Sequence, residues 1–201
     1  MNRSPFSKFL AWVLSIAIAL AIIPAVPLTV WAASDAAGTG WTFTAATGTL
    51  TVTTNNGTLA WQTGRGSNFE LSDVKIAIIQ NDVTGIQPDA FRDCVNLTSV
   101  TLPNNPNFTT ISTRAFQGAG LESIVIPDSV TTISSMAFQD CTNLTSVTLP
   151  NNSNFTTIAN STFRNTGLTG VVIPDSVTTI EIGAFSSVSI STHTPHAGRD
   201  F

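Results

Sequence analysis

The residues with the greatest potential for chemistry are the two histidines of the chain, His193 and His196, which stand three positions apart. A pair at this spacing could bind a transition metal, or one histidine could act as the base of a serine triad. No cysteine or cluster of carboxylates joins them, and nothing positions a serine of the repeats beside them. We therefore predict a disordered tail here, without a metal site.

The rest of the sequence lacks the residue constellations that are typical of enzymes. It has no glycine-rich phosphate loop, no paired carboxylates and no nucleophile motif. Four aspartates recur, with Asp128 and Asp175 in matching PDSVTTI segments and Asp93 and Asp140 in matching Asp-Cys pairs. A calcium column would need more carboxylates, so we interpret them as turn formers that bond through their side chains. We predict a protein without catalysis, cofactor or metal.

An internal repeat determines which elements must position any functional side chain. Residues 93–139 and 140–186 are identical at 31 of 47 positions. A finer pattern, Leu-x-x-apolar-x-apolar-Pro, recurs at a nearly constant spacing and starts at Leu97, Leu121, Leu144 and Leu168. An isoleucine and then a phenylalanine follow each time, and the phenylalanines, with one from a degenerate earlier copy, are Phe91, Phe116, Phe138, Phe163 and Phe185.

The physical chemistry of one repeat predicts a strand followed by turns. Val100 and Leu102 alternate with Ser99 and Thr101, which is the period of a strand with one buried face. Pro103 ends that strand, because it cannot donate to a ladder. One coil has too little apolar area to form a core alone, so successive coils must stack. The repeat therefore predicts a solenoid with one short strand per coil and a buried phenylalanine column.

Cys94 and Cys141 occupy the same position two coils apart. Coils at one strand spacing would place their Cα atoms roughly 10 Å apart. This separation exceeds the reach of a disulfide. We therefore expect two buried thiols.

The outward side chains of the predicted strands form the only candidate binding surface. They make two columns of small, mostly hydroxylated and uncharged residues: Ser99, Ser123, Ser146 and Gly170 in one, and Thr101, Val125, Thr148 and Val172 in the other. Such a face could bind a protein or a glycan, and the alternative is plain solvated β surface.

The two ends of the chain do not follow the repeat. Arg3 and Lys8 precede the uncharged residues 10–23, and small residues at Val30 and Ala32 predict a signal peptide over residues 1–32. The alternative is a retained anchor, but this apolar run is short for the roughly 20 residues that span a bilayer. Residues 189–201 lack the repeat pattern. We interpret them as sequence foreign to the repeats, such as the out-of-frame translation of repetitive DNA. We expect that tail to add nothing to stability.

The repeated run NLTSVTLPNNxNFTTI, with GLxxIVIPDSVTTI and AF, resembles the BspA-like leucine-rich repeats of bacterial surface proteins. The upstream stretch WTFTAATGTLTVTTNNGTLAW resembles the β cap that often precedes them. The resemblance implies a β-rich leucine-rich-repeat solenoid with little helix. It places an N-terminal β cap in residues 33–72 and about five repeat turns in residues 73–188. Members of the family are linked to adhesion and host-factor binding.

Charge narrows the class of partner. The chain has 8 Lys and Arg against 12 Asp and Glu, a net charge of −4, and no basic run. This balance argues against nucleic acid and, after signal cleavage, against anionic membranes. We predict a secreted or cell-surface bacterial module of adhesin type that binds an unknown protein or glycan. The alternative is a truncated, non-catalytic fragment of a larger surface protein or enzyme.

Overall fold

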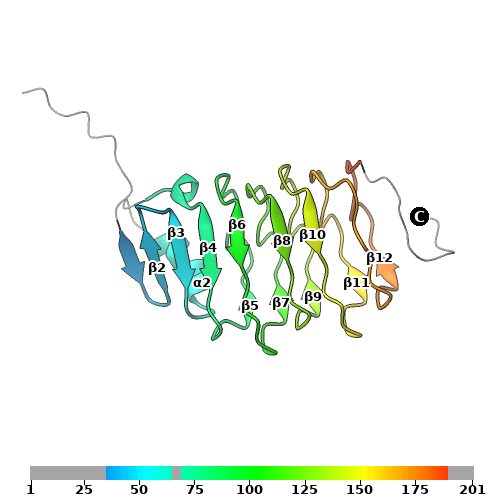
Figure 1. The fold of residues 1–201 in the computed structure, drawn as a ribbon, viewed down its shortest axis with the longest axis horizontal. Helices are drawn as coiled ribbons and strands as arrows, with labels where there is room; N and C mark the ends of the chain where they lie inside the picture. Colours follow the sequence, from blue (N-terminus) through cyan, green and yellow to red (C-terminus); the bar gives the residue numbers. More distant parts are fainter. Residues whose placement is uncertain (1–34, 65–68, 190–201) are drawn as a thin grey trace, which may run out of the picture. The chain divides into compact units, whose positions relative to one another are not determined.

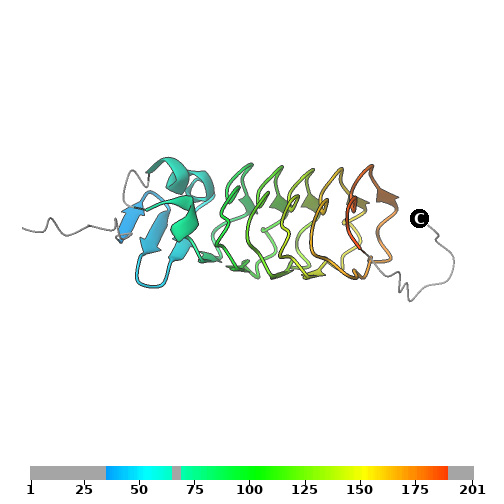
Figure 2. The same cartoon turned by 90° about the horizontal axis from the view of Figure 1, so that it is seen from above.

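Successive coils of the repeat stack one upon the next in the computed structural model, which describes residues 35–64 and 69–189 (Figure 1). The view from above shows the coils side by side, with each turn of the chain leading into the next (Figure 2). The predicted signal peptide and both histidines lie outside the described residues. The solenoid predicted from the repeat is confirmed.

Four of the described coils carry strands on two of their sides, and the last described coil carries a strand on one side only. The first strands are β4 (Ile76–Ile79), β6 (Ser99–Thr101), β8 (Ser123–Val125) and β10 (Ser146–Thr148). The structure adds a second, shorter strand that sequence analysis did not anticipate: β5 (Gly85–Ile86), β7 (Thr110–Ile111), β9 (Thr132–Ile133), β11 (Thr157–Ile158) and β12 (Thr179–Ile180). β-branched residues suit both columns, because one face of each strand packs against the core.

Pairing between the first strands follows the length of the coil. β4 pairs with β6 and β8 pairs with β10, both in parallel, with Ile76 opposite Ser99 and Ser123 opposite Ser146. The step along the chain from Ser99 to Ser123, and again from Ser146 to Gly170, is one residue longer. Within the described residues, no pairing joins β6 to β8 or continues the sheet beyond β10. The column of first strands is therefore interrupted after every second coil.

A third ladder joins the coils through the turn that carries each buried phenylalanine. The N–H of Phe91 donates to the carbonyl of Ala115 at 2.7 Å, and the N–H of Phe116 donates to Ala137 at 2.8 Å. The backbone of this turn is left-handed at two residues, a conformation that residues other than glycine adopt uncommonly. The non-glycine residues with positive φ are Asp89, Arg114, Met136 and Ser161 before the phenylalanines and Asp93, Asp140, Asn165 and Ser187 after them.

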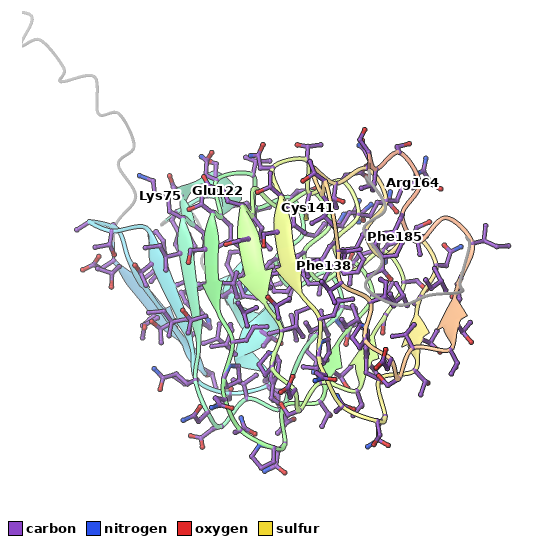
Figure 3. All side chains as sticks on the ribbon, turned by 45° about the vertical axis from the view of Figure 1, so that its right-hand side comes forward. Lys75, Glu122, Phe138, Cys141, Arg164 and Phe185 are labelled. Atoms are coloured by element: carbon purple, nitrogen blue, oxygen red, sulfur yellow. The ribbon has the colours of Figure 1, made fainter. Side chains whose placement is uncertain are left out.

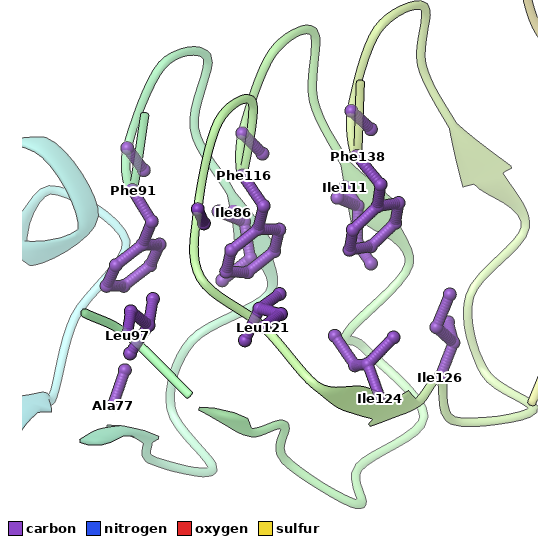
Figure 4. Packing of buried hydrophobic residues seen from close by; sticks show 14 of the residues in the cluster. Ala77, Ile86, Phe91, Leu97, Ile111, Phe116, Leu121, Ile124, Ile126 and Phe138 are labelled. Atoms are coloured by element: carbon purple, nitrogen blue, oxygen red, sulfur yellow. The ribbon is translucent and has the colours of Figure 1, made fainter. Parts of the chain in front are cut away.

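The phenylalanines form the spine of the core (Figure 4). Rings of neighbouring coils are nearly parallel, with centroids 5.2 to 5.5 Å apart along the series Phe91, Phe116, Phe138, Phe163 and Phe185. The first four rings are fully buried, whereas Phe185 in the last described coil is only partly buried. The predicted column is confirmed, with one partly exposed end.

Antiparallel strands precede the repeats. β1 (Ala36–Gly38), β2 (Trp41–Thr44) and β3 (Thr49–Val52) form a meander, and β3 pairs in parallel with β4. The sequence pattern did not predict the helix α2 (Gly57–Gly64) or the short 3₁₀ helix η1 (Leu71–Asp73) that follow. The aromatic stack continues into this segment through Trp61, which lies 5.8 Å from Phe91. A capping role for residues 33–72 stays a prediction.

Candidate binding surface

All eight residues of the predicted binding surface are exposed to solvent. In β8, Ile124 points into the core, so its neighbours Ser123 and Val125 point outward. Parallel pairing aligns Ser123 with Ser146 and Val125 with Thr148, so the two columns are in register over these two coils. Val125 and Val172 are 68% and 67% exposed. In the column of Thr101, Val125, Thr148 and Val172, hydroxyl-bearing and aliphatic side chains alternate from one coil to the next.

One part of the prediction for this surface is wrong. Gly170 and Val172 were expected in a strand beside β10, but residues 170–174 form no strand. Gly170 has no side chain that could contribute to a pleated face, and nothing lies within 4 Å of where its Cβ would be. Within the described residues, the last coil therefore forms no ladder with β10, although its phenylalanine still stacks on Phe163 at 5.5 Å.

Residues of β10 and of the last coil line a groove of about 380 Å³. One wall consists of Val147, Thr148 and Leu149, and the other includes Val172, Ile173 and Asp175. Thr148 and Val172 also belong to the predicted surface, so the groove divides two of its coils.

The β10 wall presents backbone groups as well as side chains. On its other edge, the carbonyl of Thr148 accepts a hydrogen bond from the N–H of Ile126 at 3.0 Å. The backbone groups of adjacent residues in a strand point to opposite edges. The N–H and carbonyl of Val147 and the N–H of Leu149 therefore face the groove, where no described strand pairs with them.

Charge is unevenly distributed around the coils. The described cationic side chains, Lys75, Arg92, Arg114 and Arg164, stand in the segments that precede the first strands, and Lys75 and Arg164 are labelled in Figure 3. Acidic side chains stand both in those segments, as Asp93, Glu122 and Asp140 do, and in the turns that follow the first strands, as Asp82, Asp128 and Asp175 do. Among the described residues that line the groove, Asp175 supplies a carboxylate and none is cationic.

The recurrent aspartates form hydrogen bonds between coils as well as within turns. The carboxylate of Asp128 accepts from the N–H of Asn151 in the next coil at 2.8 Å, so the predicted bond within its own turn is wrong. Asp140 accepts from the side-chain amides of Asn165 and Gln139, each at 3.0 Å. These bonds, the one from Asn165 above all, lower the pKa of Asp140.

Asp89 and Arg114 form the best-aligned ion pair among the described residues. Arg114 Nε and the second guanidinium nitrogen reach the two carboxylate oxygens at 2.8 and 3.1 Å. The hydrogen bonds from Arg114 lower the pKa of Asp89. Since Asp93 pairs with Arg92 at 3.4 Å, this turn is a network of structural ion pairs.

Neither cysteine forms a disulfide, as predicted, and both are fully buried. The Cys141 thiol donates to the carbonyl of Phe116 at 2.9 Å. Burial raises the pKa of Cys141 to about 12. A thiol that stays protonated is a poor nucleophile, so this residue is structural.

Over residues 35–64 and 69–189, no group of three or more His, Cys, Asp or Glu side chains is arranged to hold a metal ion. No helix within the same residues is long and apolar enough to cross a membrane.

Comparison with known proteins gives a family match over most of the repeats. Residues 65–191 match the BspA type leucine rich repeat region in six copies. No curated protein matches the chain with significant similarity.

The solved structure of the pneumococcal vaccine antigen PcpA shares the fold, with 24% identity and a TM-score of 0.53, over 63% of this chain and 30% of that one. Two further structures have lower TM-scores. A leucine-rich repeat protein from Bacteroides ovatus is 25% identical with a TM-score of 0.46, over 57% of this chain and 35% of that one. A leucine-rich cell surface protein from Faecalibacterium prausnitzii is 19% identical with a TM-score of 0.41, over 78% and 55%. The matches thus span from about a third to about half of these proteins.

Proposed function

The chain belongs to the family of BspA type leucine-rich repeat proteins, and we propose that it is a non-catalytic binding module that works outside a bacterial cell. The observation that carries this proposal is the exposed double column on β6, β8, β10 and the last coil, with Val125 and Val172 open to solvent. Aliphatic side chains at two of its eight positions add apolar area to an otherwise small and hydroxylated face. A binding face uses them, because burying each one against a partner removes apolar area from water.

Location outside the cell is supported by the sequence and by the family. The predicted signal peptide over residues 1–32 would direct export. The repeats that match the BspA type model are of the kind found in bacterial surface proteins. A partner outside the cell, either a protein or a glycan, is therefore the class of ligand that we propose.

The absence of catalysis is part of the proposal. The family is one of repeat proteins, and the strongest polar cluster among the described residues is the ion-pair network of Asp89, Arg92, Arg114 and Asp93. That network is satisfied internally and lies on the turn side of the coils. The network accounts for the lowered pKa of Asp89, so this pKa does not indicate a catalytic role for Asp89.

Arrays of immobilised glycans and extracellular proteins, probed with the labelled chain, would test the proposal. The variant Val125→Glu places a charge in the middle of the proposed face without disturbing the core. Val95→Glu is the matched control, because Val95 is a 57% exposed valine in the turn before β6. We expect Val125→Glu to remove a signal that Val95→Glu keeps. A signal that both variants retain, or the lack of any signal, would contradict the proposal.

A further inference from the structure

We infer that the segment around α2 imitates a preceding coil and closes the first edge of the solenoid to a second copy of the chain. The segment lies beside the first coil, which carries β4 and β5 (Figure 1). Four of its side chains, Asn55, Thr58, Trp61 and Gln62, take the place of groups that later coils receive from the coil before them. The inference concerns assembly and does not depend on the ligand of the outward columns.

The amide of Gln62 replaces the backbone N–H of a preceding phenylalanine. Along the stack, the residue before each phenylalanine accepts from the phenylalanine of the preceding coil, as the Ala115 carbonyl accepts from the Phe91 N–H at 2.7 Å. The equivalent of Ala115 in the first coil is Ala90. The carbonyl of Ala90 accepts instead from Gln62 Nε2 at 2.7 Å, and the carbonyl of Asp89 accepts from the same nitrogen at 2.7 Å. Gln62 therefore satisfies two carbonyls at the edge of the first coil.

The amide oxygen of Asn55 replaces a backbone carbonyl in the column of second strands. The N–H of Thr109 donates to the carbonyl of Thr84 in the preceding coil at 3.0 Å. The N–H of Thr84 donates in turn to Asn55 Oδ1 at 2.6 Å, and Asn55 Nδ2 donates to Thr84 Oγ1 at 2.8 Å. Asn55 thus supplies the acceptor that continues this ladder by one step.

The hydroxyl of Thr58 replaces a second carbonyl of the same column. The N–H of Ser112 donates to the carbonyl of Ile86 in the preceding coil at 3.0 Å. Gln87 occupies the position of Ser112 in the first coil, and its N–H donates to Thr58 Oγ1 at 3.4 Å. The hydroxyl of Thr58 itself donates to the carbonyl of Asn55 at 2.7 Å, so its oxygen is held in place as an acceptor.

The indole of Trp61 replaces a phenylalanine ring in the core. Its ring centroid lies 5.8 Å from that of Phe91, and the rings of Phe91 and Phe116 are 5.2 Å apart. Trp61 is fully buried and stacks on Phe69 at 6.2 Å on its other side. Phe91 therefore has an aromatic neighbour on both faces, as Phe116 and Phe138 do.

The imitation has a consequence for assembly. Without it, the first coil would present unpaired N–H and carbonyl groups, and such an edge is a template for pairing with another chain. Terminal units of stacked repeats need a cap for the same reason. The segment is held close to the strands before it, because an added Cβ at Gly57 would collide with the backbone carbonyl of Gly40. A second copy of the chain is thus kept from the edge that α2 covers.

Variants that exchange donors for acceptors test the imitation. Position 55 must accept from Thr84, so Asn55→Asp should keep the Thr84 amide protected, whereas Asn55→Leu should speed its hydrogen exchange by about tenfold. Position 62 must donate to two carbonyls, so Gln62→Glu should lower the melting temperature by several degrees more than Gln62→Lys does. Unchanged exchange at Thr84 in Asn55→Leu, or equal melting temperatures for the two variants of Gln62, would overturn the inference.

Sedimentation of the full chain over a range of concentrations tests the control of assembly. The double variant Asn55→Ala with Gln62→Ala should form larger species that the wild type lacks at the same concentrations. Asn56→Ala with Thr63→Ala is the matched control, because both residues are exposed and, among the described residues, neither side chain bonds to the first coil. If the double variant does not fold, Gln62→Glu takes its place. A folded variant that sediments as the wild type does, or equal association of the control, would contradict the inference.

Discussion

Phe116 and Phe138 stack with ring centroids 5.4 Å apart and planes inclined by only 5°. The same offset repeats between Phe138 and Phe163, at 5.4 Å and 2°. One aromatic ring per coil therefore sets the rise of the solenoid and holds the outward columns in line.

Phe138→Ala should destabilise the protein more than Phe185→Ala. Phe138 is fully buried between two rings, so its loss leaves a cavity that should cost about 3–5 kcal/mol. Phe185 has one ring neighbour among the described residues and is partly buried, so its loss should cost clearly less. Denaturant melts measure both values. Equal losses would contradict a linear stack.

The thiols of Cys94 and Cys141 should resist alkylation in the native protein. Both are fully buried, and at pH 8 a Cys141 thiol with a pKa of about 12 is almost entirely protonated. Mass spectrometry after iodoacetamide treatment should show no addition under native conditions and two additions in denaturant. A native mass lower by two hydrogens would reveal a disulfide and would be incompatible with the register of the coils.

Gly120→Ala should be destabilising, and Gly170→Ala should be nearly neutral. The added Cβ at Gly120 would collide with the backbone carbonyl of Val95, so the turn would have to shift at a cost of about 1–3 kcal/mol. Gly170 faces open space, and its substitution should stay within about 0.5 kcal/mol. Thermal melts of the two variants provide the comparison. A harmless Gly120→Ala would mean that the coils are packed less closely than described.

The ion pair between Asp89 and Arg114 should contribute stability that disappears in acid. The pKa of Asp89 is lowered in the folded protein, so its contribution is present above the unfolded pKa of about 3.9 and is lost as the pH falls through the lower folded value. Since the two side chains are 33% and 41% exposed, the coupling should not exceed about 1 kcal/mol. A double-mutant cycle of Asp89→Asn and Arg114→Gln at pH 7 and pH 2 measures it. A coupling that persists unchanged at pH 2 would refute the assignment.

The core could be predicted from the sequence because buried positions recur at fixed intervals. Phe91 to Phe185 mark one column, and the leucines that open each repeat mark another. The exposure of Val125 followed from the alternation within a short strand. In each case, one local period determines on which side a residue lies.

The groove beside β10 could not be predicted in the same way. Whether neighbouring strands pair depends on the relative rotation of two coils, which a one-residue difference in coil length alters without changing the apolar pattern. The spacing of Leu121, Leu144 and Leu168 carried that signal, but only the structure shows its effect. The left-handed turn at Arg114 and Met136 was also hidden, because it uses residues that seldom adopt positive φ.

The most direct test of the account is hydrogen–deuterium exchange of the chain with and without a ligand found on the arrays. Binding at the outward columns predicts slower exchange in residues 123–125 and 146–149 and in residues 170–175. The turn that carries Asp89 and Arg114 should not change. Protection confined to that turn, or to the column of second strands from β5 to β12, would contradict the account.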